Sequence, residues 1–374
     1  MKALLFALAV TLSTAHASAQ NVNAVFNTPK FSGQLNLNIE NELISMIDQA
    51  VTGSSIHFSI YTFDRETISK ALIRAHVRGV NVRGVLDGGM RKESKKEGSG
   101  MNVLAKGLPA DRLKFCRSFI IGGSCRALAI NHNKFMLFSQ LSDGRKNVFA
   151  LTSANWNSSQ FKNQNDLLIF ANDEVLFNGV MAYWNGLMNS KLPVPLLIQG
   201  STPATAVYTF PNRKTDPVLD VLNQVTCDLP GSKIRVMQSR FLDDRKAVAQ
   251  RLAELSRQGC EVKILTRDEP NKKSPGPNVK AILGLLQTII RYKGGEDDGI
   301  PSIHSKVVAI DARVNGSAAR VPLVLAGSHN LNSNSLTKND ELLARVIDRT
   351  VLDGYMKYWD ETVAAAHAAG IILQ

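Results

Sequence analysis

The sequence contains the same set of polar residues twice, in the same order and at nearly the same spacing. His132 and Lys134 in the first half recur as His304 and Lys306 in the second half. Each pair is followed by a Ser-x-Asn sequence and then by an acid, 11 residues after the Asn in both copies. These residues are Ser153, Asn155 and Asp166 in the first copy, and Ser328, Asn330 and Glu341 in the second. Such a duplication predicts a chain that folds as two similar units.

The similarity extends beyond these polar residues. At an offset of 175 residues, a glycine, a tyrosine and a tryptophan of one half fall on the same residue types in the other: Gly179 and Gly354, Tyr183 and Tyr358, Trp184 and Trp359. The second copy has three extra residues between its His and its Asn, which we expect in a turn at 315–317. Residues 78–87 also resemble residues 258–268, and each segment predicts a helix end, a glycine and an alternating strand.

The order of the predicted elements favours an α/β fold. Helical and strand patterns alternate along each half, so we expect two similar α/β/α lobes with mixed sheets flanked by helices. The lobes are expected at residues 20–195 and 205–374, joined by a Pro-rich crossover around 191–205. A His and a Lys at positions i and i+2 of a strand point to one face. Two such faces, one from each lobe, can therefore form one shared site.

The first 19 residues have the features of a signal peptide. A short basic start, Met1-Lys2, precedes an apolar run, and Ala17-Ser18-Ala19 fits a small-x-small cleavage site. The alternative is a buried first helix. The apolar run is too short to span a membrane, which takes roughly 20 residues. We therefore expect a secreted or periplasmic protein that begins near Gln20.

The formal net charge is +12, and it becomes +11 without Lys2. A basic surface of this size favours polyanions such as nucleic acid or anionic lipid. A soluble exported protein with a high isoelectric point is the alternative. The densest basic segments, residues 90–100 and 268–278, are interrupted by Gly, Ser or Pro and predict loops.

Four cysteines in an exported chain predict disulfides. Cys116 and Cys125 would close a loop just before His132, and Cys227 and Cys260 would pair in the second half. A buried free thiol is the alternative for Cys260. The spacings lack the CxxC or HxxxH pairs of a zinc site, so the sequence predicts no metal and no cofactor.

The paired polar residues suit the chemistry of a phosphodiester, whose negative charge repels nucleophiles. Lys134 and Lys306 can supply positive charge, and Asn155 and Asn330 can donate hydrogen bonds to phosphate oxygens. One imidazole can attack phosphorus while the other protonates the leaving alcohol and later activates water. A carboxylate beside each ring would hold it in place, and the candidates are Asp166 and Glu341. Ser153 and Ser328 are expected to support the two asparagines.

The second motif resembles the phospholipase D pattern HxKxxxxD…GSxN. It runs from His304 through Lys306 to Asp311, and continues with Gly327-Ser328-His329-Asn330. The first copy is similar, but Ser139 replaces the Asp and Thr152 replaces the Gly. The resemblance covers essentially the whole chain after residue 19. It implies a metal-independent phosphodiesterase that works through a phosphohistidine.

The same resemblance implies roles for individual residues. His132 is expected to be the nucleophile and His304 the acid and base, with Asp311 as a structural partner. Because one chain carries both half-sites, a monomer is expected. His57 and His76 lack a lysine partner and are expected to be structural or solvent-facing. His329 occupies the variable middle position of the Ser-x-Asn sequence, and a place in the lining of the pocket is its alternative role.

The substrate is left open by the sequence. The first hypothesis is a secreted phospholipase D that cleaves phosphatidylcholine-type lipid to phosphatidate, with the apolar segment 118–123 in peripheral contact with a membrane. The second is a secreted endonuclease, which the basic charge favours. The third is a polyanion-binding protein with a degenerate first site, although His132, Lys134 and Asn155 are all present.

Overall fold

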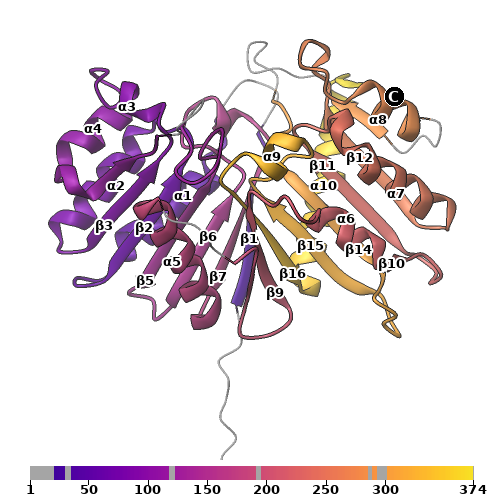
Figure 1. Ribbon diagram of the computed structural model, residues 1–374, viewed down its shortest axis with the longest axis horizontal. Helices are drawn as coiled ribbons and strands as arrows, with labels where there is room; N and C mark the ends of the chain where they lie inside the picture. Colours follow the sequence, from indigo (N-terminus) through magenta and orange to yellow (C-terminus); the bar gives the residue numbers. More distant parts are fainter. Residues whose placement is uncertain are drawn as a thin grey trace, which may run out of the picture.

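The computed structural model describes residues 21–29, 35–117, 123–190, 195–284, 289–292 and 301–373. Two sheets lie side by side, each with helices against it (Figure 1). The first sheet has seven strands in the order β1-β7-β6-β5-β2-β3-β4. Its strands are β1 (Asn21–Asn27), β2 (Ser55–Ile60), β3 (Asn81–Leu86), β4 (Leu113–Phe115), β5 (Lys134–Gln140), β6 (Lys146–Thr152) and β7 (Asn165–Ala171).

The second sheet has ten strands, nine of them in the order β17-β13-β12-β11-β14-β15-β16-β9-β8, with β10 paired to β14. The strands are β8 (Leu197–Gln199), β9 (Thr205–Phe210), β10 (Val225–Thr226), β11 (Lys233–Gln238), β12 (Glu261–Arg267), β13 (Ile289–Tyr292), β14 (Lys306–Val314), β15 (Val321–Gly327), β16 (Glu341–Ile347) and β17 (Ile372–Leu373). The run β7-β6-β5-β2-β3 of the first sheet matches β16-β15-β14-β11-β12 of the second in order and in pairing direction. The expected α/β architecture with two duplicated mixed sheets is therefore confirmed.

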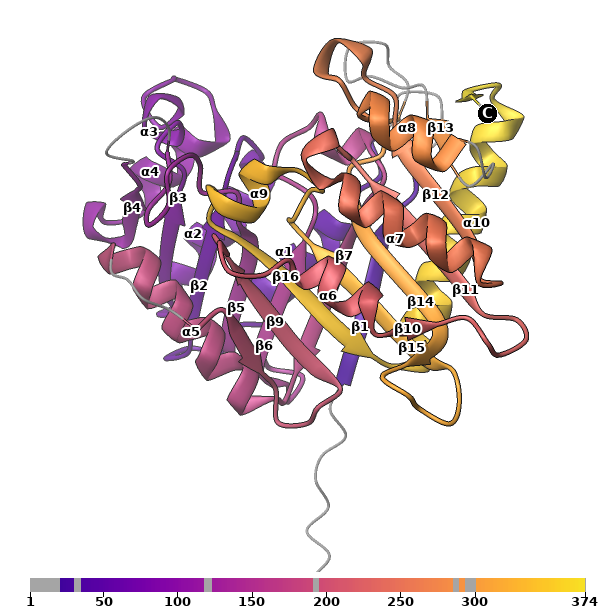
Figure 2. The ribbon, with the colours of Figure 1, turned by 45° about the vertical axis from the view of Figure 1, so that its right-hand side comes forward.

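Helices cover the outer face of each sheet. In the first lobe these are α1 (Asn38–Gln49), α2 (Glu66–Val77), α3 (Met90–Glu93) and α4 (Gly100–Gly107). In the second lobe they are α6 (Pro217–Asn223), α7 (Lys246–Arg257) and α8 (Pro277–Gly284), which Figure 2 shows in front of β11, β12 and β14. A short helix, α9 (Ser333–Thr337), precedes β16.

Two longer helices occupy matching positions after the acid-bearing strands. They are α5 (Glu174–Asn189) and α10 (Arg349–Ala368). Each begins at an aspartate whose side chain accepts a hydrogen bond from the third residue after it: Asp173 from Leu176, and Asp348 from Val351. This cap satisfies one of the free N–H groups at a helix start. The matched caps give both helices the same starting point relative to the strand before them.

The two lobes share a central core. Successive side chains along a strand point to opposite faces of the sheet. Phe135 and Leu137 of β5 therefore point into a cluster that also contains residues of the second sheet. Met136 and Phe138 face the outer helices of the first lobe. Trp184 of α5 and Trp359 of α10 both lie in this central cluster. Burial of apolar residues from both sheets in one cluster holds the lobes together.

Backbone contacts also cross between the lobes beside the two histidine motifs. The N–H of His132 donates to the carbonyl of Asp340 over 2.9 Å, and the N–H of His304 donates to the carbonyl of Gln164 over 2.9 Å. Each histidine segment therefore runs beside the start of the acid-bearing strand of the other lobe. This exchange is what brings residues of both repeats into one site.

Disulfides join Cys116 to Cys125 and Cys227 to Cys260, so the alternative of a free thiol at Cys260 was wrong. The Pro-rich crossover contains β8, the last strand on one edge of the second sheet. The expected signal peptide lies outside the described residues. Within the part of the chain that is described, no helix has the length and apolar character needed to span a bilayer.

Candidate active site

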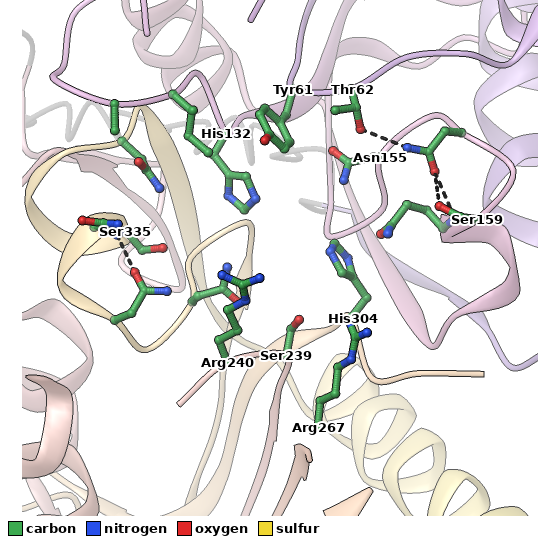
Figure 3. Close-up of a pocket in the computed structure, with 18 residues that line it drawn as sticks. Tyr61, Thr62, His132, Asn155, Ser159, Ser239, Arg240, Arg267, His304 and Ser335 are labelled. Carbon is green, nitrogen blue, oxygen red and sulfur yellow. Dashed lines mark hydrogen bonds between the residues drawn. The ribbon is translucent and has the colours of Figure 1, made fainter. Parts of the chain in front are cut away.

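The two histidines of the repeats face each other across a cavity of about 470 Å³ (Figure 3). His132 lies just before β5, and His304 lies just before β14. Both are largely buried, with 8% and 9% of their surface exposed. The cavity lies between the lobes, as the duplication predicted, because each lobe contributes one histidine and one Ser-x-Asn turn.

The two motif lysines lie beneath the histidines and not on the cavity wall. The ammonium of Lys134 donates to the carbonyl oxygen of His132 over 2.7 Å, and that of Lys306 donates to the carbonyl of His304. Both side chains are almost completely buried. Burial lowers the pKa of Lys134 to about 7 and that of Lys306 well below its usual value, and the mutual repulsion of the two ammonium groups adds to the shift for Lys306.

His132 is held by the acid of the opposite repeat. Its Nδ1 lies 3.1 Å from Oε1 of Glu341, and the same oxygen accepts a hydrogen bond from the Asn339 amide over 2.8 Å. Burial and Lys134 lower the pKa of His132 to about 4, although Glu341 acts in the opposite direction. Burial opposes ionisation of Glu341, but contact with His132 keeps the pKa of this carboxyl below its usual value. An ionised Glu341 beside a neutral ring places the ring proton on Nδ1 and leaves Nε2 as the free nitrogen.

His304 has a neutral partner in place of the expected acid. Its Nδ1 lies 3.1 Å from the side-chain oxygen of Asn165. The amide nitrogen of Asn165 donates to the carbonyls of Gln160 and Asn163, which identifies the atom facing His304 as the oxygen. Nδ1 of His304 can donate to this oxygen, and Nζ of Lys306 also lies 3.2 Å from the same Nδ1. Burial and Lys306 lower the pKa of His304 well below its usual value, so this ring is also neutral.

Asp166 therefore does not have the position that we expected for it. Its two carboxylate oxygens accept hydrogen bonds from Ser153 and from Tyr355 of α10, each over 2.9 Å. Burial raises its pKa, although these hydroxyl contacts act against the shift. An Asp side chain is one methylene shorter than a Glu, and here it links β7 to a helix of the other lobe. The expectation that both acids orient histidines is corrected: Glu341 contacts a ring, and Asp166 contacts hydroxyls.

The two Ser-x-Asn turns place matching amides in the cavity. Asn155 and Asn330 both line it, and the side-chain oxygen of each has no hydrogen-bond partner among the described residues. A Cβ on Gly327 would lie 2.5 Å from the carbonyl of Leu342, so the second turn requires glycine. In the first turn Thr152 occupies this place, and its hydroxyl bonds to the carbonyl of Asp166 over 2.7 Å.

The two supporting serines hold their turns against the following strands. The N–H of Ser153 donates to the carbonyl of Asp166, and the N–H of Ser328 donates to the carbonyl of Leu342, each over 3.0 Å. The hydroxyl of Ser328 also lies 3.4 Å from the carboxylate of Glu341. Both serines are fully buried, so they act on the position of the asparagines and not on the cavity surface.

Asp311 lies inside β14, five residues after Lys306. Both of its oxygens accept hydrogen bonds from Arg349, over 2.9 and 3.2 Å. In the first copy the hydroxyl of Ser139 accepts from the N–H of Ser55 over 2.9 Å. Each residue therefore ties its strand to a neighbouring element, by an ion pair in one lobe and by a neutral hydrogen bond in the other.

The remaining singled-out histidines lie outside the cavity lining. His57 packs edge-on against Trp184 at 4.5 Å, and burial lowers its pKa to about 4. His76 is half-buried on α2. His329 is stacked on Phe210 at 4.0 Å and is buried behind Glu341, and burial lowers its pKa to about 3.

Sequence reasoning missed several residues that line the cavity or contact its histidines. The most prominent are Tyr61, Asn165, Arg240 and Arg267. Asn165 immediately precedes Asp166, the acid of its repeat, and this position was the one sign in the sequence that Asn165 lies near the site. The arginines lie at or near the ends of predicted strands, but they have no counterpart in the other repeat. The repeat therefore gives no signal for these two arginines.

Among the residues that the structure describes, no cluster of three or more His, Cys, Asp or Glu side chains could hold a metal ion. The charged groups closest to the two histidines are lysines, arginines and Glu341. The fold and the cavity thus define a duplicated α/β protein with one two-histidine site formed by both halves.

A model of the family described as "Cardiolipin synthase, PLD-like domain" matches residues 43–188 and 227–363, one segment in each lobe. The chain therefore belongs to this phospholipase D-like family. No curated protein matches the sequence.

Solved structures with the same fold differ widely in sequence. Phosphatidylserine synthase from Haemophilus influenzae is 11% identical, with a TM-score of 0.58 over 91% of this chain and 86% of that one. Polyphosphate kinase from Porphyromonas gingivalis is 14% identical, with a TM-score of 0.56; the match covers 92% of this chain and only half of the kinase. A mutant of yeast tyrosyl-DNA phosphodiesterase is 12% identical, with a TM-score of 0.51 over 87% of this chain and 89% of the enzyme. At these identities the similarity establishes the fold.

Proposed function

We propose that the protein is a phosphodiesterase that needs no metal and works through a phosphohistidine. Nε2 of His132 attacks phosphorus, and the bond to the leaving oxygen breaks as Nε2–H of His304 protonates that oxygen. His304 then takes a proton from water, which displaces His132 and releases the phosphate product. The observation that carries this proposal is the pair of facing rings, with Nδ1 of His132 3.1 Å from Glu341 and Nδ1 of His304 3.1 Å from Asn165.

The different partners of the two rings support this division of roles. A phosphorylated histidine ring is cationic, and the ionised Glu341 beside His132 stabilises such a charge. The neutral Asn165 stabilises a charged His304 much less, so that ring gives up its proton more readily. A negatively charged substrate supplies the charge that favours protonation of His304 before the reaction begins.

The other paired residues of the repeat serve the phosphate in this proposal. The phosphate of the substrate lies between the two rings, and Lys134 and Lys306 lie below it. The negative charge of a bound phosphodiester favours the protonated form of both lysines, which then place positive charge next to the phosphate. Asn155 and Asn330 donate hydrogen bonds to its non-bridging oxygens from opposite sides. Fixed donors in a buried site stabilise developing negative charge without reorganisation.

We further propose that the preferred substrate is a nucleic-acid strand. The lining consists mostly of Asn, Ser and Arg, and no Asp or Glu of the described chain lines the cavity. A choline headgroup is a cation, and it would meet Arg240 and Arg267 without a carboxylate or an aromatic cage to receive it. Tyr61, whose ring centroid lies 5.2 Å from that of His132, offers one face on which a base can stack.

A phospholipid substrate is the second candidate function. The description of the matched family model as a cardiolipin synthase favours it. The apolar lip that we expected to touch a membrane, residues 118–123, lies almost wholly outside the described residues. The third hypothesis, a binding protein with a degenerate first site, has less support because both half-sites contain a His, a Lys and an Asn.

We also propose that the protein is exported and acts as a monomer. Two disulfides are consistent with a location outside the cytoplasm. Both histidines, both lysines and both asparagines of the site come from one chain, so a second copy adds nothing to the site.

The test is a comparison of three substrates with EDTA present: bis(p-nitrophenyl) phosphate, single-stranded DNA and phosphatidylcholine vesicles. The wild type is expected to release p-nitrophenol and to cut DNA, and His132→Ala is expected to do neither. His304→Ala should accumulate phosphorylated His132 with the nitrophenyl ester, because p-nitrophenol leaves without an acid but water is no longer activated. His76→Ala, on α2, is the control. Choline release without DNA cleavage would reverse the order of the two candidate substrates, and full activity of His132→Ala would refute the mechanism.

A further inference from the structure

The two half-sites have the same reactive residues but different charged residues around them. The strand pairs establish which positions correspond. Ile60 of β2 pairs with Lys134, and Gln238 of β11 pairs with Lys306, so the chain positions two residues beyond them, Thr62 and Arg240, are equivalent. Ile60 also pairs with Leu86 of β3, and Gln238 with Thr266 of β12. The next residues, Asp87 and Arg267, are therefore equivalent as well.

The two arginines of the second lobe are suited to bind an anion in the cavity. Both line it, and Figure 3 shows both directed toward the histidine pair. Arg267 is only 6% exposed; Nη2 forms an ion pair with Glu269 at 2.8 Å, but the buried Nε has no hydrogen-bond partner among the described residues. The guanidinium of Arg240 has no acidic partner in the described part of the chain. A buried guanidinium nitrogen without a partner is costly, and an anion would satisfy it.

The corresponding positions of the first lobe cannot bind an anion in the same way. Asp87 is buried, and its two oxygens accept from the backbone N–H groups of Asn131 and Gly89 over 2.9 and 2.8 Å. Thr62 is uncharged. One side of the cavity thus carries two arginines, whereas at the equivalent positions of the other side only the uncharged Thr62 lines the cavity and Asp87 lies behind the wall, so the site distinguishes the two ends of a substrate.

On the basis of the proposed function, we infer that Arg240 and Arg267 form a second phosphate-binding position on the departing side of the scissile phosphodiester. Attack by His132 requires the leaving oxygen to lie on the opposite side of phosphorus, next to His304. Both arginines lie on the second-lobe wall of the cavity, Arg267 below His304 and Arg240 below His132 (Figure 3). A phosphate on the departing fragment, such as the next phosphate of a nucleic-acid strand, would therefore meet Arg267 first, and Arg240 extends the positive charge along the same wall. Guanidinium groups bind phosphate in paired, charge-assisted contacts.

The experiment compares three short substrates: the dinucleotide TpT, the same dinucleotide with a 5′-phosphate, and the same with a 3′-phosphate. One of the phosphorylated forms places its extra phosphate on the departing nucleotide. Its kcat/KM is expected to exceed that of TpT by about ten- to a hundredfold, the gain from one charge-assisted contact. The dinucleotide with its extra phosphate on the other nucleotide should have a kcat/KM close to that of TpT. In Arg240→Gln and Arg267→Gln, the ratio between the favoured form and TpT should fall toward one, whereas Arg257→Gln on α7 removes the same charge elsewhere and should keep the ratio.

Binding separates this inference from the proposed function. Dissociation constants of the three dinucleotides for His304→Ala should show the same preference without any turnover. Hydrolysis of TpT with equal kcat/KM for all three forms would overturn the second phosphate position and leave the phosphodiesterase intact. Binding that prefers one phosphorylated form through Arg240 and Arg267, in a wild type that cleaves nothing, would keep the position and refute the proposed function. Equal binding of all three forms would refute the position on its own.

Discussion

At the scale of single residues, the site combines symmetric reactive groups with asymmetric partners. His132 and His304 are related by the duplication, yet one contacts an ionised carboxylate and the other an amide oxygen. The difference arises from one step along the chain: the acid itself, Glu341, reaches a ring in one half-site, and the residue before the acid, Asn165, reaches it in the other. In the proposed mechanism, two identical rings can therefore carry out different steps of one reaction.

This asymmetry predicts unequal effects of two conservative substitutions. Glu341→Gln removes the charge that stabilises a cationic His132, and a loss of kcat of about 10- to 100-fold is expected, as for other residues that orient a reactive histidine. Asp166→Asn keeps a side chain that can bond to Ser153 and Tyr355, so a much smaller loss is expected. Steady-state rates on bis(p-nitrophenyl) phosphate measure both. Equal losses would show that Asp166 also acts through a ring.

The buried lysine predicts how anion binding depends on pH. The pKa of Lys134 is about 7 without a ligand, so the group is neutral at higher pH, and a bound anion must restore its proton. Affinity for sulfate, which stays doubly charged in this range, should fall as pH rises from 7 to 9, by at most about tenfold per pH unit for one proton. Calorimetry in two buffers with different ionisation enthalpies measures the proton uptake. A dissociation constant that does not change between pH 7 and 9 would contradict this account.

At the scale of elements, each lobe places its motif by the same means. A strand that begins at the motif lysine is held by neighbouring strands, and a capped helix follows the acid-bearing strand. The disulfides differ between the lobes. Cys116–Cys125 lies next to the segment that leads to His132, and Asp340 of the other lobe accepts from Ser124 and from the N–H of Cys125. Cys227 and Cys260 both belong to the outer core of the second lobe.

Removing each disulfide should therefore have a different effect. Replacing Cys227 and Cys260 by Ser opens a loop with a sequence separation of 33 and should lower the free energy of unfolding by about 3–4 kcal/mol. Turnover at moderate temperature should change little. Replacing Cys116 and Cys125 opens a shorter loop, for which about 2–3 kcal/mol is expected, but it should also reduce turnover because Ala129 and Ile130 of the adjoining segment line the cavity. Thermal unfolding and kcat are measured on both double variants. Equal effects on kcat would refute the different roles assigned to the two disulfides.

At the scale of the whole molecule, the lobes form one unit. A central cluster contains residues of both sheets and of both long helices, and each histidine segment is hydrogen-bonded to the acid-bearing strand of the other lobe. Neither lobe contains a complete site, because His132 needs Glu341 and His304 needs Asn165. The site exists only when both halves of the chain fold together.

This arrangement predicts the outcome of mixing two inactive variants. If one chain supplies both halves of the site, an equimolar mixture of His132→Ala and His304→Ala should remain inactive, because every site lacks one histidine. Light scattering on the wild type should give the mass of one chain. A site shared between two chains would instead recover a substantial fraction of the wild-type rate in the mixture. Recovery of this kind would refute the proposed monomer.

The sequence by itself determined the duplication and the α/β class, and it predicted the six paired residues of the proposed site. These features can be detected from local patterns alone, namely the spacing of apolar residues and the order of residue types along the chain. The matching strand orders, the facing histidines and the central position of the two tryptophans agree with those patterns. The disulfide partners could be narrowed to a preferred pairing, and the structure contains that pairing.

The tertiary structure alone decided which side chain reaches which ring. Asp166 and Asn165 are neighbours in the sequence, and only the position of β7 beside the His304 segment turns the amide toward that ring. Arg240 lies two residues after β11 and Arg267 is the last residue of β12, and both line the cavity because β11 and β12 are adjacent and parallel. Burial, which lowers the pKa of Lys134 to about 7, likewise depends on atoms from both lobes. Contacts between distant segments depend on how the sheets pack, and no local pattern in the chain encodes them.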